Sequence, residues 1–158
     1  MEIEANTRKT DVLILMGSSS DIPTMEKAAA QLQEFGLSSE IIISSAHRNP
    51  DRTAQIAREA QERGVKVIIA GAGMAAALPG AVAAHTNLPV IGVPCASGAL
   101  NGFDSLLSIA QMPPGIPVAC VAINGAKNAA VLAAQIIATG DAEVAAKVAE
   151  FRRKQSAA

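Results

Sequence analysis

The chain has 158 residues, of which half are hydrophobic and only three are aromatic, and its formal net charge is −1. This length fits one domain with a sizeable core. The balanced charge and the absence of Trp and Tyr argue against a nucleic-acid-binding protein, which needs basic patches or aromatic stacking surfaces. No apolar run reaches the roughly 20 residues that a membrane span requires, so no membrane partner is expected.

The N-terminus and the cysteines favour a cytoplasmic protein. Residues 1–10 are polar and lack the apolar stretch of a signal peptide, so we expect a flexible N-terminus there. Cys95 and Cys120 are the two cysteines. Two thiols are too few for a disulfide framework or a metal site, so we expect neither.

Five short apolar runs alternate with helical patterns along the chain. The predicted strands cover residues 11–16, 40–44, 66–70, 89–93 and 117–122. The predicted helices cover residues 21–35, 50–63, a short stretch from about 79, 103–110, 126–139 and a C-terminal helix at 141–156. Asp21 and Asp141 are candidate N-caps, and Gly36 and Gly64 are candidate helix stops. Whether the last helix packs on its own domain or on a neighbouring subunit is left open.

Strict alternation with short connections predicts a parallel sheet with helices on both faces. We expect residues 1–158 to form a single flavodoxin-like three-layer α/β/α sandwich with strand order 2-1-3-4-5. Ligands bind such sheets at the carboxyl ends of the strands. The loops that follow the first three strands are therefore the candidate site.

The loop after the first strand reads Gly17-Ser18-Ser19-Ser20-Asp21. Hydroxyls and free N–H groups at a helix N-terminus favour an anion such as phosphate. Asp21 would repel a phosphate but accepts hydrogen bonds from a ribose diol. A simple helix cap is the alternative explanation for Asp21. The Walker ending and the Gly-x-Gly-x-x-Gly pattern are absent, so neither an ATP loop nor a dinucleotide fingerprint is indicated.

The loop after the second strand contains His47 and Arg48, held in a turn by Pro50. An imidazole exchanges protons near neutral pH, and a guanidinium binds phosphate oxygens. A loop histidine beside a solvated arginine is the alternative. The second histidine, His85, follows a short helix and is interpreted as a surface or capping residue.

The loop after the third strand, residues 71–80, has no ionisable group, so its contribution must come from backbone and small side chains. Such a loop can hold a planar ring and bind a carboxylate through N–H groups. A tight structural turn is the alternative. We find no metal-ligand spacing and no serine-nucleophile elbow, so we expect neither a metal nor an organic cofactor.

At these residues the chain resembles the PurE family, the N5-carboxyaminoimidazole ribonucleotide mutases of purine biosynthesis. The resemblance spans about residues 11–153, and its main motifs are Met16 to Asp21, Ser45 to Pro50, Ile69 to Gly73, Leu78-Pro79-Gly80, Pro89 to Pro94, Asp104 to Ile109 and Gly115 to Ala119. It implies a homo-octameric isomerase without cofactor that moves a carboxylate from the exocyclic nitrogen to C4 of the ring, through trapped CO2.

The resemblance also implies roles for individual residues. His47 is the implied proton shuttle, and Ser20, Ser45 and Arg48 are the implied phosphate ligands. The remaining implied substrate contacts are Ser18, Asp21, Ala46, Ala72, Gly73 and Leu78.

The third loop departs from the family pattern. Bacterial mutases usually read Gly-Gly-Ala-Ala-His-Leu-Pro-Gly there, whereas this chain has Met74 at the second glycine and Ala77 at the histidine. The animal-type carboxylases, which use free CO2, read Ala-Gly-Arg-Ser-Asn in this loop, and the chain does not match them either. An aminoimidazole ribonucleotide carboxylase, a paralogue with altered loop chemistry and a non-catalytic nucleotide-binding module are the alternatives.

Overall fold

The computed structural model describes residues 9–157, so most of the predicted flexible N-terminus at 1–10 lies outside the described residues. The strands are β1 (Val12–Met16), β2 (Ser39–Ile43), β3 (Val67–Gly73), β4 (Val90–Cys95) and β5 (Ala119–Cys120). The helices are a 3-10 turn η1 (Ser19–Asp21), α1 (Ile22–Glu34), α2 (Pro50–Glu59), α3 (Ala77–Ala83), α4 (Phe103–Ala110), α5 (Ala126–Ala138) and α6 (Ala142–Ser156).

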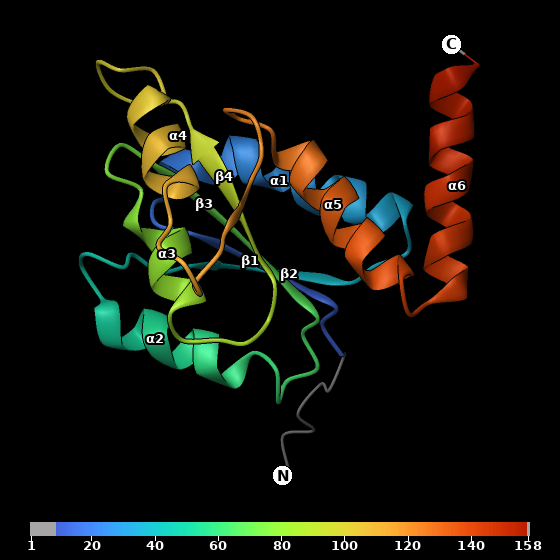
Figure 1. The fold of residues 1–158 in the computed structure, drawn as a ribbon, viewed down its shortest axis with the longest axis horizontal. Helices are drawn as coiled ribbons and strands as arrows, with labels where there is room; N and C mark the ends of the chain where they lie inside the picture. The colour runs from blue at the N-terminus through green and yellow to red at the C-terminus, as the bar shows by residue number, and fades with distance from the viewer. Residues whose placement is uncertain (1–8, 158) are drawn as a thin grey trace, which may run out of the picture.

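The five strands form one parallel sheet in the order β2-β1-β3-β4-β5, which confirms the predicted topology. Helices α1 and α5 cover one face, and α2, α3 and α4 cover the other (Figure 1). All four longer strands therefore end at the same edge, where their loops meet. Among the described residues, no helix is both long enough and apolar enough to cross a membrane.

Side chains of β1 alternate between two cores, one on each face of the sheet. Val12, Ile14 and Met16 pack with α1 and α5, whereas Leu13 and Leu15 pack beneath α2, α3 and α4. All five are fully buried, as the continuous apolar run predicts for a strand covered on both faces. The rigid central strand fixes the position of the loop that follows it.

Two predicted helix stops are confirmed, and several element boundaries differ. Gly36 and Gly64 take positive φ angles of 71° and 85°, and the N–H groups of Leu37 and Val65 bond back to Leu32 and Ala60. Regular α2 nevertheless ends at Glu59, and turns carry the chain from there to Gly64. Strand β3 runs to Gly73 and α3 begins at Ala77, so the loop between them is shorter than expected.

Strand β5 is much shorter than the predicted 117–122, since only Ala119 and Cys120 pair with β4. It lies at the edge of the sheet and follows Pro117, which has no N–H to donate to a ladder. Cys95 and Cys120 are both free thiols, as expected.

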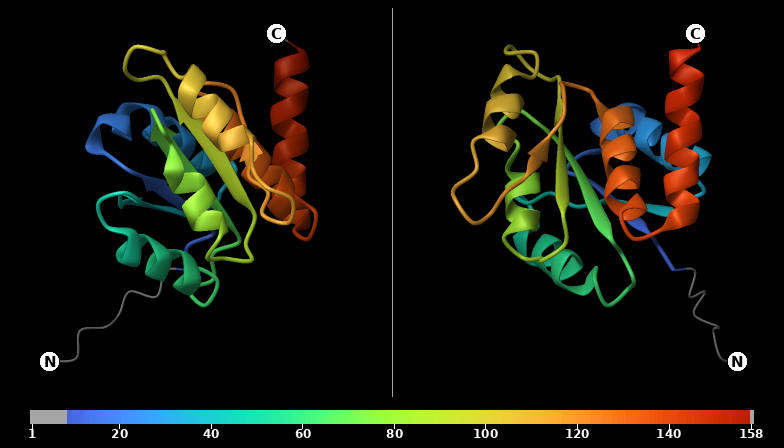
Figure 2. Two further views of the ribbon diagram at one scale, coloured as in Figure 1. Left: turned by 60° about the vertical axis from the view of Figure 1, so that its left-hand side comes forward. Right: turned by 45° about the vertical axis from the view of Figure 1, so that its right-hand side comes forward.

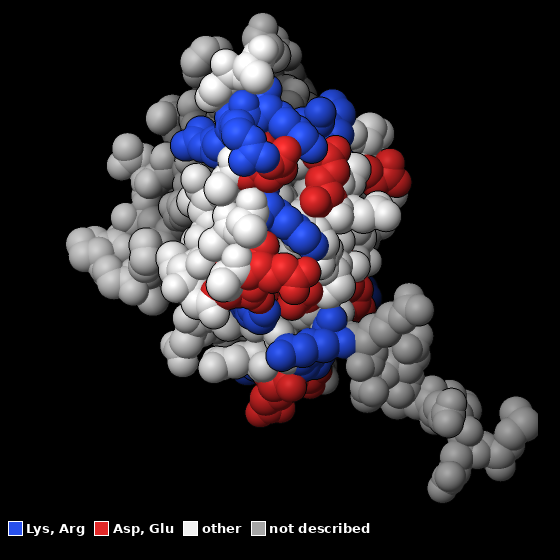
Figure 3. All heavy atoms as spheres, turned by 90° about the vertical axis from the view of Figure 1, so that its right-hand side faces the viewer, with Lys and Arg blue, Asp and Glu red and all other residues white. Residues whose placement is uncertain are grey.

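The C-terminal helix α6 packs on its own chain. It contacts α5, and the ring of Phe151 meets that of Phe35 edge to face with centroids 5.3 Å apart. As predicted, Asp141 caps the helix by accepting hydrogen bonds from the N–H groups of Glu143 and Val144, both at 3.1 Å. Figure 2 shows α6 standing outside α5, and Figure 3 shows Lys and Arg gathered toward its C-terminal end, where they suit the helix dipole.

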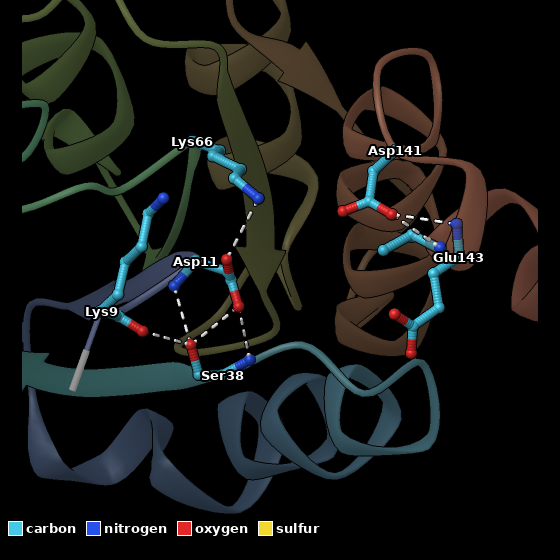
Figure 4. A network of polar contacts seen from close by, with 7 residues as sticks. Lys9, Asp11, Ser38, Lys66, Asp141 and Glu143 are labelled. Carbon is cyan, nitrogen blue, oxygen red and sulfur yellow. Dashed lines mark hydrogen bonds and ion pairs between the residues drawn. The ribbon is translucent and has the colours of Figure 1, made fainter.

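A polar network ties the start of β1 to its two neighbouring strands (Figure 4). The Asp11 carboxylate accepts hydrogen bonds from the backbone N–H of Ser38 at 3.0 Å and from its hydroxyl at 2.8 Å, and it pairs with Lys66 at 3.2 Å. Partial burial alone would raise the pKa of Asp11, but the Ser38 hydrogen bonds and the charge of Lys66 outweigh it and lower the pKa.

We expect Asp11→Asn to destabilise the fold by about 1–3 kcal/mol at neutral pH, because a charge-assisted acceptor is lost. The folded pKa of Asp11 lies below the ordinary 3.8. The Asp11 carboxylate therefore stabilises the fold fully above pH 3.8, and this stabilisation is lost as the pH falls through the folded pKa. Denaturant unfolding of both proteins against pH measures this, and a difference that stayed constant down to strong acid would contradict the charge-based explanation.

Candidate active site

A cavity of about 400 Å³ lies at the carboxyl edge of the sheet, between the loops that follow β1, β2, β3 and β4. The structure brings all ten predicted site residues to its walls: Ser18, Ser20, Asp21, Ser45, Ala46, His47, Arg48, Ala72, Gly73 and Leu78. This volume suits one small ligand, such as a mononucleotide.

The first loop turns its hydroxyls into the cavity. The Ser18 side chain accepts hydrogen bonds from the N–H of Ser20 at 3.3 Å and from the Ser20 hydroxyl at 2.9 Å. Ser18 thereby caps η1, and the turn is fixed before any ligand arrives. Ser19 does not line the cavity, so two of the three consecutive serines are placed for binding.

Asp21 occupies the N-cap position of α1, as predicted, but its side chain makes no capping hydrogen bond. The expectation that it stabilises the helix end is therefore wrong. Its half-buried carboxylate lines the cavity instead. Burial raises the pKa of Asp21, and a backbone hydrogen bond with Ser18 offsets part of that rise. Because no capping hydrogen bond to α1 occupies it, this carboxylate is available to a ligand hydroxyl.

The second loop is joined to the first by Arg48. The Arg48 guanidinium donates to the Gly17 carbonyl at 3.0 Å, and its backbone N–H donates to the Ser45 hydroxyl at 3.2 Å. His47 stands between these anchored residues and lines the same cavity while remaining exposed. An anion held by the hydroxyls and the guanidinium would place the rest of its molecule beside the imidazole.

The third loop contributes small side chains and backbone. Ala72 and Gly73 line the cavity, but Gly71 does not. A Cβ on Gly71 would lie 2.3 Å from the Met25 sulfur, so this glycine serves the packing of α1 on the sheet. Gly71 thus has a structural role, although it lies in β3 and not in the tight turn considered above.

Six residues of the cavity wall are not among the predicted site residues: Gly17, Met74, Ala75, Ala76, Ala77 and Ser97. Ser97 follows β4, and its loop is held where the Ala96 N–H donates to the Asn124 side chain at 2.9 Å. The sequence contains a signal for Ser97, because a serine shortly after the fourth strand lies at the same edge of the sheet as the loops after the first three strands. Met74 was noted only as a departure from a family motif.

Other reactive side chains lie elsewhere or are inactive. His85 is outside the cavity, with its Nδ1 3.2 Å from the Arg58 guanidinium. Burial, and then the charge of Asp21, raise the pKa of Cys95 to about 12, so its thiol stays protonated and is a poor nucleophile. Within residues 9–157, no three His, Cys, Asp or Glu side chains cluster as metal ligands would. The cavity therefore offers an anion site, a carboxylate for a diol and one imidazole for proton transfer.

Comparison with known proteins identifies the family. The sequence profile described as AIR carboxylase matches residues 11–158 of the chain. The chain belongs to the AIR carboxylase family. That match contains the whole candidate site, so the cavity can be compared with sites in relatives of known activity.

Three relatives share most of their length with this family member. The N5-carboxyaminoimidazole ribonucleotide mutase of Thermotoga maritima is 59% identical over 141 residues, covering 89% of this chain and 82% of that protein. The mutase of Pyrococcus horikoshii is 56% identical and covers 97% and 86%, and that of Vibrio parahaemolyticus is 58% identical and covers 90% of both.

Solved structures agree with this assignment. PurE of Treponema denticola superposes with a TM-score of 0.83 at 36% identity, covering 92% of this chain and 90% of that one. A variant of PurE2 from the same organism gives a TM-score of 0.85 at 35% identity, covering 94% and 92%. The sheet order and the C-terminal helix are thus those of a known enzyme fold.

Proposed function

We propose that this chain is an N5-carboxyaminoimidazole ribonucleotide mutase, an isomerase of purine biosynthesis, and that residues 1–158 form one catalytic domain. The observation that carries the proposal is that His47 lines one cavity together with Ser20, Ser45 and Arg48. Identities of 56–59% to three mutases over most of the chain support it.

The substrate is oriented by its phosphate and its ribose. Ser20, Ser45 and Arg48 bind the phosphate, because they supply two hydroxyls and a guanidinium to the cavity wall. Ser18 and Asp21 bind the nucleotide next to it, with the carboxylate of Asp21 accepting from the ribose hydroxyls. The ring then lies against Ala46, Ala72, Gly73 and Leu78, whose small or apolar surfaces allow close contact.

His47 carries the proton in both halves of the reaction. The bond from the exocyclic nitrogen to the carboxylate breaks, its electron pair stays on nitrogen, and the imidazolium of His47 protonates that nitrogen as CO2 forms. C4 of the electron-rich ring then attacks CO2 with its own electron pair. Neutral His47 removes the C4 proton, which restores aromaticity and returns the imidazole to its starting state.

Such a reaction requires that CO2 stay beside the ring between the two steps. The cavity supports this because ring, phosphate and imidazole are held together and the transfer is effectively intramolecular. Exclusion of water from the walls of the cavity would also prevent loss of the intermediate.

We further propose a cytoplasmic homo-octamer. Helix α4 and the preceding loop carry Leu100, Phe103 and Leu107 with exposed fractions of 58%, 66% and 59%. Exposed apolar side chains grouped in this way are typical of a subunit contact, and a mass measurement in solution tests the assembly. The two free thiols suit a reducing compartment.

The activity is tested by two assays on the purified protein without ATP. With the N-carboxylated ribonucleotide, we expect the absorbance of the 4-carboxy product to grow at an enzymatic rate. With the uncarboxylated ribonucleotide and bicarbonate, we expect a much slower reaction. The reverse preference would indicate the carboxylase named by the family description. Tight binding without turnover in either assay would indicate a nucleotide-binding module.

A further inference from the structure

Met74 holds a strained backbone conformation in the cavity wall. Its φ is +54°, in the left-handed region, and Ala76 two residues later has a φ of +43°. Such angles are unfavourable for a residue with a side chain relative to the right-handed form. A glycine would take this conformation without the penalty.

The Met74 side chain does not offset this strain by packing in the core. It is 58% exposed, whereas the neighbouring Leu78 is 3% exposed. Its Cγ, Sδ and Cε atoms lie 3.8–4.0 Å from the position that a Cβ on Gly98 would occupy. The side chain thus reaches from the β3–α3 loop to the β4–α4 loop, and both loops contribute residues to the cavity wall.

The other cavity-lining residues near Met74 in the chain carry no long, exposed apolar side chain. Gly73, Ala75, Ala76 and Ala77 have no side chain longer than a methyl group, and Leu78 is buried below them. Met74 is therefore the one long apolar side chain at this rim of the cavity among residues 9–157. A methionine is flexible and apolar, so it can follow the shape of a ring and exclude water from it.

We propose that Met74 closes the cavity over the bound heterocycle and determines whether CO2 is transferred to C4 or escapes. The proposal rests on the mutase function proposed above. When CO2 escapes, the ribonucleotide has lost its carboxylate, the exocyclic nitrogen keeps the electron pair and a proton, and the uncarboxylated aminoimidazole ribonucleotide is released. Escape and transfer therefore give different products from one intermediate.

The test compares Met74→Gly, Met74→Ala and Met74→Leu in the intact chain. The N-carboxylated ribonucleotide is the substrate, and the ratio of uncarboxylated to 4-carboxy product is measured after correction for spontaneous decarboxylation. We expect both the glycine and the alanine variants to raise this ratio by about tenfold, because an apolar wall is lost and Ala77 offers no larger side chain in its place, unlike the histidine that follows the glycine in the family's usual loop. Labelled bicarbonate in the buffer should also enter their 4-carboxy product, and Met74→Leu, which keeps a long apolar side chain, should restore a product ratio close to the parental one.

The three variants separate the side chain from the backbone. Met74→Gly relieves the left-handed strain, and we expect it to unfold at a higher denaturant concentration than the parent, whereas Met74→Ala does not. Leakage in Met74→Gly alone would attribute the effect to the backbone and overturn the proposal. Parental product ratios in all variants would also overturn it, as would leakage that appears only when the assembly, measured by mass, dissociates.

Failure of the proposal is distinguishable from failure of the mutase function. If the parent protein itself does not isomerise the substrate, the proposed function fails, and this inference fails with it. If the parent isomerises it efficiently and the glycine and alanine variants do so without added loss of CO2, only the role of Met74 is refuted.

Discussion

Replacing His47 with asparagine is expected to lower the isomerisation rate by about 10²- to 10⁴-fold, the usual contribution of a positioned acid–base group. Asparagine preserves polarity and approximate size but cannot carry a proton between the exocyclic nitrogen and C4. Because the proposed phosphate ligands Ser20, Ser45 and Arg48 are unchanged, binding of the ribonucleotide should largely survive. Absorbance assays give the rate, and calorimetry gives the dissociation constant.

His85→Asn is the matched control for this experiment. His85 is the only other histidine in the chain, it lies outside the cavity, and it contacts Arg58. We expect that variant to retain parental turnover. A His47→Asn protein that turned over substrate near the parental rate would remove the proton shuttle from the mechanism, whatever the control showed.

Replacing Arg48 with methionine is expected to raise KM by about 10- to 100-fold, equivalent to the loss of one charged hydrogen-bonding group of roughly 1.5–3 kcal/mol. The guanidinium points toward the first loop, where it donates to the Gly17 carbonyl at 3.0 Å, and it lines the cavity. The phosphate is remote from the reacting bonds, so kcat should fall less than KM rises.

Arg52→Met provides a close control, because Arg52 also donates its guanidinium to a backbone carbonyl, that of Ile43 at 3.1 Å, yet does not line the cavity. We expect its KM to match the parent. Inorganic phosphate should inhibit the parent and the Arg52 variant competitively and the Arg48 variant weakly. Equal KM values for both arginine variants would exclude Arg48 from the phosphate site.

The site could be predicted because it depends on local sequence patterns, namely apolar strand runs and their alternation with helices. Runs such as Val12 to Leu15 are buried on both faces, and this is the pattern that a central parallel strand requires. Once the alternation of strands and helices indicated the parallel sheet, the loops after β1, β2 and β3 had to meet at one edge. That argument placed His47 near Ser20 and Arg48 without any long-range information.

Features set by hydrogen bonding across the structure were predicted less well. Asp21 has the residue type of a helix cap, but Ser18 caps the preceding turn and leaves the Asp21 carboxylate facing the cavity. Strand β5 is limited to the residues that pair with β4, and the apolar run at 117–122 does not by itself indicate where that pairing ends.

The amino-acid sequence by itself determined the strand order, the helix stops at Gly36 and Gly64, and the edge at which the site lies, because these follow from periodicity, backbone conformation and chain connectivity. Only the tertiary structure decided that Gly71 is a packing residue beneath Met25 and that Met74 belongs to the cavity wall. The reason is physical: which side of a loop meets a neighbouring loop depends on contacts between residues distant in the chain, and local sequence does not encode them.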